Sequence, residues 1–531
     1  YIQTIRAANG GHIDLSGLTT IATIGGNMLT IAPSAGGSID LSSLSEAGRT
    51  TFVASAGVTL DLPGLASLTT GTLTVEDGGT LNASALTSLT STPLTVSGTG
   101  TLTAPVLATL SNSSLTLNSA ADVSLPGLTS IAGGVSEFTV NVTSGTNLSL
   151  PALTNTDFTV FTVQGTGVLT APVLSSATNT RWILNGGAQV SLPGLTTYSW
   201  TRNGYYTIFD VDGVDSHLDV SAVATLTVNT GSSYIQTIRA TNGGHIDLSG
   251  LTTIATIGGN MLTIAPSAGG SIDLSSLSEA GRTTFVASAG VILDLPGLTS
   301  LTTGTLTVED GGTLNASALT SLTSTPLTVS GTGTLTAPVL ATLSNSSLTL
   351  NSGANVSLPG LTSIEGDTSE FTVTVKNGTT LNLPALTSTD YAVFTVQGAG
   401  VLTTPILASA TNTRWILSGG AQVSLPGLTT YSWTRNGYYT IADVDGAGSL
   451  LDLSAVTTLT VNTGSSYIQT IRATNGGHID LSGLITITTV ATNRLTVTAS
   501  GSGSVVDLTG LTTYDASSVS FDPQNGGSIL L

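Results

Sequence analysis

The 531-residue chain has no cysteine, one lysine (Lys376) among its 11 basic residues, and only 8% charged side chains. The missing cysteines exclude a disulfide framework and any metal site built from cysteine ligands. So few basic residues, with a net charge of −19, argue against nucleic acid and anionic membranes as partners. No apolar run reaches the ~18 residues of a membrane span, so the sequence predicts no transmembrane helix.

Repetition dominates what is present. Segment 1–233 recurs as 234–466 with about 27 of 233 positions changed, and a third copy begins at Tyr467 and diverges after Leu484. Hydrophobic residues make up 40% of the chain, which argues against disorder. Self-similarity over a long period is typical of architectures that lengthen by adding units. The sequence therefore predicts three segments, 1–233, 234–466 and a partial copy 467–531, within one continuous solenoid.

A shorter phrase recurs inside each long copy, as in Ile13-Asp-Leu-Ser-Gly-Leu18 and Leu60-Asp-Leu-Pro-Gly-Leu65. Its ten occurrences start 21 to 28 residues apart, and 21 is the commonest spacing. Within each unit, apolar residues alternate with Thr, Ser, Asn or Asp in three groups separated by Gly-rich corners. Period-2 alternation is typical of strands with one buried face, and the density of Thr, Val and Gly excludes helix.

These patterns predict an all-β fold, a three-faced parallel β-solenoid of about 23 coils with about 21 residues in the minimal coil. We expect a right-handed coil, because the left-handed hexapeptide type needs about 18 residues per turn. Adjacent strands lie about 4.8 Å apart, so ten coils should rise roughly 48 Å and the chain about 110 Å. One coil position must be a bend between faces, because it holds prolines, which lack the N–H of a ladder. These prolines are Pro63, Pro105, Pro126, Pro151, Pro172 and Pro193.

One aromatic-rich insertion occurs in each long copy, where the coil lengthens to 28 residues. Exposed tyrosine and tryptophan rings stack on sugars, pack over a widened coil, or form contacts between rods, and the sequence leaves these three roles open. The predicted surface-contact residues are Tyr198, Trp200, Tyr205, Tyr206, Tyr431, Trp433, Tyr438 and Tyr439.

Three aspartates in the same insertion, Asp210, Asp212 and Asp215, resemble the start of a calcium loop, since calcium takes converging carboxylate and carbonyl oxygens. The second copy reads Asp443-Val-Asp-Gly-Ala-Gly448 and lacks the third carboxylate, and no distal glutamate completes either loop. A structural turn is the competing interpretation. Calcium is the only cofactor that the sequence suggests.

Carboxylates also recur at one outward position of successive coils, at Asp14, Asp40 and Asp61. Polysaccharide-cleaving β-helix enzymes place carboxylates on neighbouring coils. Such enzymes would also need a basic residue nearby, and this chain has few basic residues. The same position holds Asn82, Thr103 and Ser124, as expected of a column kept polar for solvent.

The remaining motifs carry little chemistry. Four histidines, His12, His217, His245 and His478, are isolated in the sequence, and no catalytic triad or phosphate loop is present. We therefore predict no enzymatic activity. Outward Thr-x-Thr phrases, such as Thr72 to Thr74 and Thr101 to Thr103, leave an ice-binding surface as an alternative, although threonine is also a common strand residue.

The Leu-Asp-Leu-Pro-Gly-Leu-Thr-Ser-Leu phrase, set in Gly/Thr/Ser-rich coils along the whole chain, resembles the repeat regions of giant secreted bacterial adhesins and surface-fibre proteins. The resemblance implies an extracellular or cell-surface scaffold. No leader peptide or secretion domain is visible, and the sequence starts inside a repeat, so we expect a mature chain or a segment of a longer one.

Open solenoid ends expose unpaired backbone groups, so we expect head-to-tail stacking into filaments. If the chain instead continues in further repeats, covalent tandem copies provide the length. The residues predicted to stack are Tyr1, Ile2, Ile5, Ile529, Leu530 and Leu531.

Overall fold

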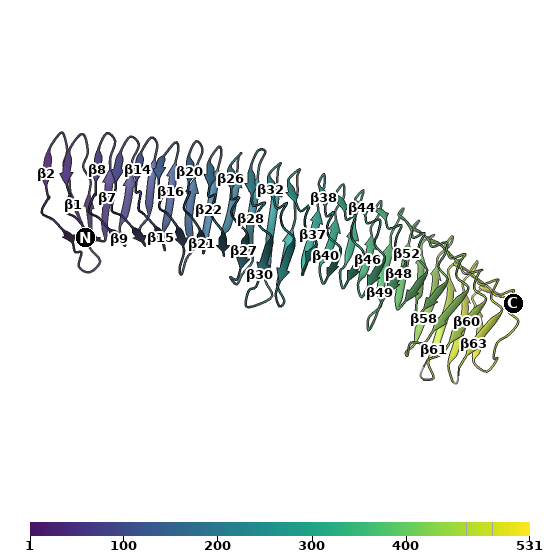
Figure 1. The fold of residues 1–531 in the computed structure, drawn as a ribbon. Coiled ribbons are helices and arrows are strands. Elements are labelled where there is room, and N and C mark those ends of the chain that lie inside the picture. Colours follow the sequence, from purple (N-terminus) through teal and green to yellow (C-terminus); the bar gives the residue numbers. More distant parts are fainter. Residues whose placement is uncertain (464, 491) are drawn as a thin grey trace. The chain divides into compact units, whose positions relative to one another are not determined.

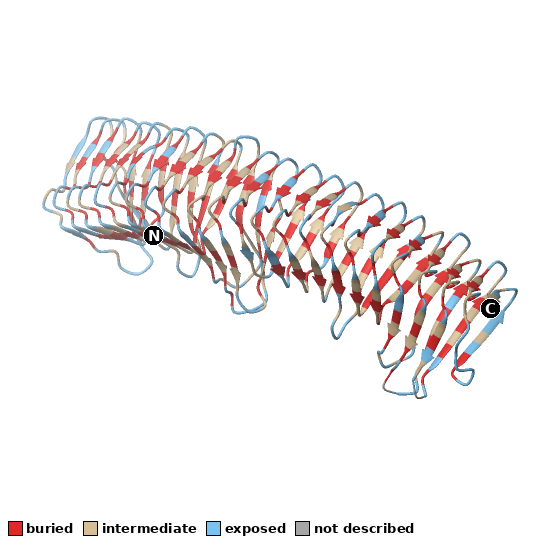
Figure 2. Cartoon of the chain, turned by 45° about the vertical axis from the view of Figure 1, so that its right-hand side comes forward, coloured by how far each residue is buried: buried red, intermediate tan, exposed pale blue. Residues whose placement is uncertain are grey.

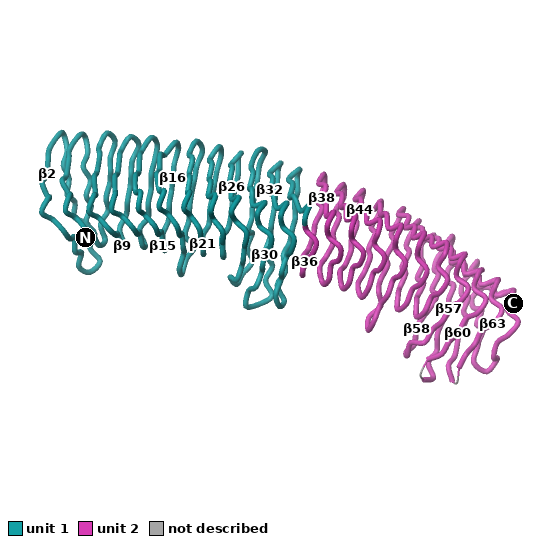
Figure 3. The backbone as a smooth tube through the Cα atoms, viewed as in Figure 1, with its two compact units in different colours: residues 1–276 teal, residues 277–531 magenta. Residues whose placement is uncertain are grey.

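The computed structural model describes residues 1–463, 465–490 and 492–531, and every regular element in them is a β-strand (Figure 1). The strand pairings within these ranges are all parallel, so the predicted all-β parallel solenoid is confirmed. Among the described residues, no helix is long and apolar enough to cross a membrane. The chain forms two compact units, Tyr1–Ser276 and Leu277–Leu531 (Figure 3).

One coil of the first unit illustrates the repeat. Strands β8 (Thr59–Asp61), β9 (Ser67–Thr69) and β10 (Thr72–Val75) follow one another along the chain. They pair with β11 (Thr80–Asn82), β12 (Ser88–Thr90) and β13 (Leu94–Ser97) of the next coil. In the first of these pairs, Leu60 lies beside Leu81, 21 positions later. The predicted three strands per coil and the 21-residue spacing are confirmed; the hand of the coil stays a prediction.

Up to β65, every third strand belongs to the same face, and three faces result in each unit. The long face runs from β1 (Ile2–Ile5) to β34 (Met261–Ile264) in the first unit, and from β37 (Thr283–Ala287) to β64 (Arg494–Ser500) and then β66 (Val519–Gln524) in the second. The second face runs from β3 (Thr20–Ile21) to β33 (Thr253–Thr256) and from β36 (Glu279–Ala280) to β63 (Thr486–Thr489). The phrase face carries the repeated phrase, from β2 (His12–Asp14) to β35 (Ser271–Asp273) and from β38 (Ile292–Asp294) to β65 (Val505–Asp507) and β67 (Ser528–Leu530).

Buried residues recur along the strands of each unit (Figure 2), and the apolar residues among them form its aliphatic core. Burial of one leucine or valine side chain stabilises the fold by roughly 1.5–3 kcal/mol, and each coil repeats the contribution. The core residues of the coil that begins at β8 are all buried: Leu60, Leu62, Leu65, Leu68, Leu73 and Val75.

Where an aspartate ends a phrase-face strand, the corner after it takes one of two main forms. In the Asp-x-Ser form, a carboxylate oxygen accepts a hydrogen bond from the backbone N–H two residues later, as from Ser16 to Asp14 at 2.9 Å. In the Asp-x-Pro form, Pro63 has no N–H to donate, and Asp61 instead accepts from the Asn82 amide at 2.7 Å. Pro63 lies in the turn between β8 and β9, so the predicted bend is confirmed there.

The 28-residue coil is widened by large aromatic side chains that point inward. Tyr198 and Trp200 lie on β27 (Thr197–Trp200) of the second face, and both rings are buried. On the long face, the register of β28 (Tyr206–Asp212) shifts between Thr207 and Phe209, which leaves Ile208 as an extra residue. Ile208 and Phe209 are consecutive and both buried, so this β-bulge interrupts the alternation of the strand.

Candidate functional site

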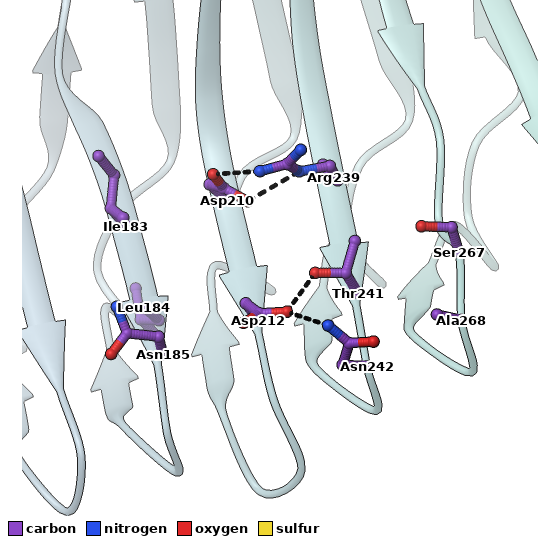
Figure 4. Close-up of a pocket in the computed structure, with 10 residues that line it drawn as sticks. All are labelled: Ile183, Leu184, Asn185, Asp210, Asp212, Arg239, Thr241, Asn242, Ser267 and Ala268. Atoms are coloured by element: carbon purple, nitrogen blue, oxygen red, sulfur yellow. Dashed lines mark hydrogen bonds and ion pairs between the residues drawn. The ribbon is translucent and has the colours of Figure 1, made fainter.

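A polar groove of about 500 Å³ opens on the long face of the first unit, at the C-terminal ends of its strands (Figure 4). We define it by Asp210 and Asp212 on β28, Arg239 and Thr241 on β31 (Ile235–Thr241), and Asn242 just after that strand. Asp210 lies beside Arg239 and Asp212 beside Thr241 in the strand register. Residues two apart on a strand face the same side, so parallel pairing brings these side chains together.

One edge of the groove is a two-point contact between opposite charges. Arg239 donates from Nε to Asp210 Oδ1 at 3.0 Å and from Nη2 to Asp210 Oδ2 at 2.8 Å. The hydrogen bonds to this carboxylate raise the pKa of the Arg239 guanidinium, which is permanently charged in any case. The Arg239 side chain is still 49% exposed, so the guanidinium remains accessible from solvent.

The second carboxylate of the groove is held by neutral groups. Asp212 Oδ1 accepts hydrogen bonds from the Thr241 hydroxyl at 2.6 Å and from the Asn242 amide at 2.7 Å. These two donors, the Thr241 hydroxyl first, lower the pKa of the Asp212 carboxyl. Ile183 and Asn185 of β25 (Arg181–Asn185) line the groove on the side next to Asp210 and Asp212 (Figure 4). Ser267 lines it on the other side, beyond Arg239 and Thr241.

The second unit contains the same groove, of about 660 Å³, on β58 (Tyr439–Asp445) and β61 (Ile468–Thr474). Arg472 contacts Asp443 through hydrogen bonds of 2.9 and 2.6 Å. Asp445 accepts from Thr474 and Asn475, both at 2.7 Å. Each unit therefore carries one groove with the same set of polar groups.

The three aspartates of the predicted calcium loop do not converge on one point in the structure. Asp210 is engaged by Arg239 and Asp212 by Thr241 and Asn242, whereas Asp215 lies after the strand end in a left-handed turn conformation with φ of 65°. Within the described ranges, no three Asp, Glu or His side chains converge in a way that could hold a metal ion. Calcium binding by this segment stays a prediction.

The predicted surface-contact set divides into buried and exposed residues. Four of the eight, Tyr198, Trp200, Tyr431 and Trp433, have at most 1% of their surface exposed, so their assignment as surface-contact residues was wrong. They fill the interior of the widened coils, which is the local packing that the sequence left open. Tyr205 and Tyr438 are each 71% exposed, and Tyr206 and Tyr439 are half-buried.

A second cluster, which sequence reasoning missed, lies where strands of the long face begin. Glu137 forms ion pairs with Arg181 and Arg202. The Arg202 guanidinium lies 4.8 Å from the centre of the Tyr206 ring and 5.2 Å from that of Phe158. The second unit repeats the cluster with Glu370, Arg414, Arg435, Tyr391 and Tyr439. One glutamate facing two arginines over aromatic rings ties neighbouring coils together.

The outward carboxylates lie where the sequence predicted them. Asp40 and Asp61 line a shallow groove of about 390 Å³ together with His12 and Thr59. Asp40 accepts a hydrogen bond from the Ser42 N–H at 2.9 Å, so it belongs to a corner of the coil. A role in cleaving polysaccharide was the alternative for this column, and it stays untested.

The histidines are not all isolated in space. His217 on β29 (His217–Asp219) and His245 on β32 (His245–Asp247) are register partners, and their rings lie 5.1 Å apart. Burial, followed by the neighbouring His217, lowers the pKa of His245, whose Nδ1 lies 2.7 Å from the Ser271 hydroxyl. In the second unit the equivalent neighbour of His478 is Leu450, so the pair is present in one unit only.

The threonines form columns on the long face, but not an unbroken array. Thr74 lies beside Thr95, which lies beside Thr116 in the next coil. Asn141 and then Thr162 continue the column, and Ile183 follows at the wall of the groove. On the phrase face, Thr101 and Thr103 are register partners of Asp122 and Ser124.

The six predicted end-stacking residues lie in the first and last strands and beside them. Tyr1 is 98% exposed and Ile2 71%, and at the other end Leu530 and Leu531 are exposed as well. Ile5 and Ile529 are half-buried.

Together, the strand pairing and the repeated coils make the chain a β-solenoid repeat protein. No protein-family model matches the sequence, and no curated protein matches it either. Among solved structures, the chain is similar to CroV588, described as a novel circular LRR protein structure, with 12% identity over 94% of this chain and 88% of that chain. The TM-score of 0.19 is too low for this likeness to carry an argument.

Proposed function

We propose that this solenoid is a structural segment of an extracellular fibre or adhesin stalk. The proposal is supported mainly by one observation: equivalent coils of the two units have nearly the same sequence and the same strand register. The pair Thr51–Thr72 in the first unit recurs as Thr284–Thr305 in the second, with the same register along the strand. A sequence duplicated with so few changes, in which core and ladder are kept, suits a protein that is used for its length and uniformity.

Localisation tests the extracellular part of this proposal. An antibody against the purified chain should label intact cells of the source organism, and protease treatment of those cells should remove the label. Because the chain has few basic residues, a protease of broad specificity is preferable to trypsin. Label found only after permeabilisation would contradict the proposal.

Self-association into filaments is the second part of the proposal. The chain exposes apolar side chains in its first strand and just after its last, with Ile2 71% and Leu531 64% exposed. Stacking of one chain on another through these edges would extend each ladder without closing a ring. Electron microscopy of the purified chain at rising concentration should show filaments, whereas single particles at every concentration would contradict it.

A matched pair of variants separates end stacking from general stickiness. Ile2→Lys places a charge on the terminal edge and should abolish the filaments. Val135→Lys is the control, since Val135 is fully exposed on a loop away from both terminal strands and its substitution should leave filaments unchanged. If both variants behave like the original chain, the filaments arise from some other surface, and covalent repeats in a longer protein become the better explanation of length.

A saccharide-binding surface module is the second candidate function, and the polar groove favours it. Arg239, Asn242 and Thr241 present charged, amide and hydroxyl groups around a volume within the range of small-ligand sites. A glycan array should then show binding that Arg239→Ala combined with Arg472→Ala abolishes, because each unit carries one such groove. An array with no signal would leave the groove as part of the scaffold.

A further inference from the structure

We propose that Tyr205 and Tyr234 form a site of oxidative cross-linking, at which their rings are joined as dityrosine between two successive coils. The two rings meet edge to face with their centres 5.3 Å apart. The second unit repeats the arrangement at Tyr438 and Tyr467, again at 5.3 Å. At this separation the rings are already in van der Waals contact, so only a small rotation is needed to bring two ring carbons together.

The loops that carry the two tyrosines are tied to each other. The Gly231 N–H donates to Asn203 Oδ1 at 2.8 Å, and the Gln236 side-chain amide donates to the Gly204 carbonyl at 2.9 Å. Gln236 is fully buried beneath the loops. Because these bonds flank both tyrosines, the ring pair is held in place rather than met by chance, which favours coupling within one molecule.

Exposure selects this pair among the tyrosines of the widened coil. Tyr205 is 71% exposed, so an oxidant or an enzyme can reach its hydroxyl group. Tyr198 is buried and donates its hydroxyl to the Thr180 carbonyl. Tyr206, the next residue in sequence, packs against Trp200 with ring centres 4.9 Å apart and lies under Arg202.

The reaction requires an oxidant, and hydrogen peroxide used by a haem peroxidase supplies it. Each phenol loses one electron and one proton to give a phenoxyl radical. The two radicals form one carbon–carbon bond between ring positions next to the hydroxyl groups. Two carbon-bound hydrogens then leave as protons while the rings regain aromaticity and the two oxygens are reprotonated. One peroxide is reduced to two molecules of water, so the protein loses two hydrogen atoms in all.

Such a bond would join coils that are otherwise held by the backbone ladder and side-chain contacts. Tyr205 precedes β28 and Tyr234 precedes β31, and these strands are neighbours on the long face. The link would therefore fasten one coil covalently to the next, once in each unit. The modification site does not depend on whether the protein proves to be extracellular.

The test treats the purified full chain with a haem peroxidase and hydrogen peroxide. The monomer is then isolated under denaturing conditions and digested with a protease that cleaves before aspartate. In the original chain this protease separates fragment 157–209, with Tyr205, from fragment 219–246, with Tyr234 as its only tyrosine. We expect the two fragments to remain joined, lighter by two hydrogen atoms than their sum, together with dityrosine fluorescence.

Two conservative variants locate the bond. Tyr205→Phe should lose the joined fragments of the first unit, whereas the matched Tyr206→Phe should keep them. Both changes retain the aromatic ring, so the fold is preserved, and the Tyr438–Tyr467 pair serves as an internal reference for the oxidation. The proposal is overturned if the treated monomer contains no joined fragments, if tyrosines couple only between molecules, or if Tyr205→Phe leaves the joined product unchanged.

Discussion

The hydroxyl of Tyr198 donates a 2.6 Å hydrogen bond to the backbone carbonyl of Thr180, inside a coil that is wide enough to enclose the whole ring. Burial raises the pKa of the Tyr198 hydroxyl well above its usual value, so the group stays protonated and keeps donating in alkaline solution. The second unit has the same contact, from Tyr431 to Thr413 at 2.6 Å. A tyrosine in this position therefore packs inside its coil, in each of the two units.

Tyr198→Phe should destabilise the widened coil by about 1–3 kcal/mol, because the Thr180 carbonyl loses its side-chain donor in a place that water does not reach. In a solenoid the loss stays local, so amide hydrogen exchange is the appropriate measurement. Faster exchange is expected in the coils around β27, with the unchanged Tyr431 coil as the reference. Equal exchange in the two coils would show that this hydrogen bond contributes little.

Trp200→Ala should lower the free energy of unfolding much more than Tyr205→Ala, although the two residues are only five positions apart. Trp200 is fully buried, and removal of such a ring costs about 3–5 kcal/mol. Tyr205 is mostly exposed, and apart from its contact with Tyr234 its removal should cost less than about 1 kcal/mol. Urea unfolding followed by hydrogen exchange in the same coil distinguishes the two. Similar losses for both variants would contradict the burial pattern of the insertion.

The fold could be predicted because its pattern is strictly local. Apolar residues equivalent to Leu60 and Leu62 recur in every coil, most often 21 residues apart, and inward and outward positions follow from the alternation alone. The interior place of Tyr198 was missed, although a signal was present. Tyr198 is the register partner of Ala177 and Leu226, which are both inward, and extending the alignment of coils through the insertion would have found it.

The groove was harder to predict. Its carboxylates, Asp210 and Asp212, were singled out, but their partner Arg239 was not. The spacing from Asp210 to Arg239 is 29 residues, whereas the phrase-face partners His217 and His245 of the same coils are 28 apart. The β-bulge at Ile208 changes the spacing again, to 30 between Thr207 and Thr237. A bulge leaves no clear mark in this sequence, because both Ile208 and Phe209 are apolar and either suits a buried position.

Loss of the Arg239–Asp210 contact should have a small effect that depends on salt. Asp210→Asn combined with Asp443→Asn removes both two-point contacts, and half-exposed ion pairs of this kind contribute about 0.2–1 kcal/mol each. The difference from the original chain in urea unfolding should shrink as salt is raised to about 1 M, because screening weakens the pair. An effect that does not change with salt would indicate that shape rather than charge holds these side chains.

Acid should lower the folding stability around the two grooves, because Asp212 and Asp445 become protonated. Hydrogen bonds from neighbouring hydroxyl and amide groups lower the pKa of both carboxyls below the ordinary value of 3.8. A depressed folded-state pKa means that the unfolded chain takes up protons first as the pH falls. The stabilisation is therefore fully present above about pH 4 and is lost as the pH falls through the folded-state pKa. The double variant Asp212→Asn and Asp445→Asn should remove this part of the acid dependence. Unfolding profiles of the two chains that run parallel down to about pH 2 would contradict it.

The two forms of the corner predict that proline can replace serine within the repeated phrase. Ser249 donates its N–H to Asp247 at 2.9 Å, and the equivalent position of another coil holds Pro63. Ser249→Pro loses one hydrogen bond, worth about 0.5–1.5 kcal/mol, but restricts the unfolded chain by about 0.4–1 kcal/mol. The net change in unfolding free energy should therefore lie within about 1 kcal/mol of zero.

Gly250, the residue after Ser249, is the matched position at which a substitution should not be tolerated. A side chain added at Gly250 would collide with the Ser221 carbonyl of the preceding coil, so Gly250→Ala should force the two coils apart and accelerate hydrogen exchange in both. If Ser249→Pro proves as damaging as Gly250→Ala, the corners of different coils are not interchangeable. If both variants are tolerated, the coils are packed less closely at this corner than the structure indicates. Only the combination of a tolerated proline and a damaging alanine fits this corner, where the backbone suits proline at position 249 and passes too close to the Ser221 carbonyl for a side chain at position 250.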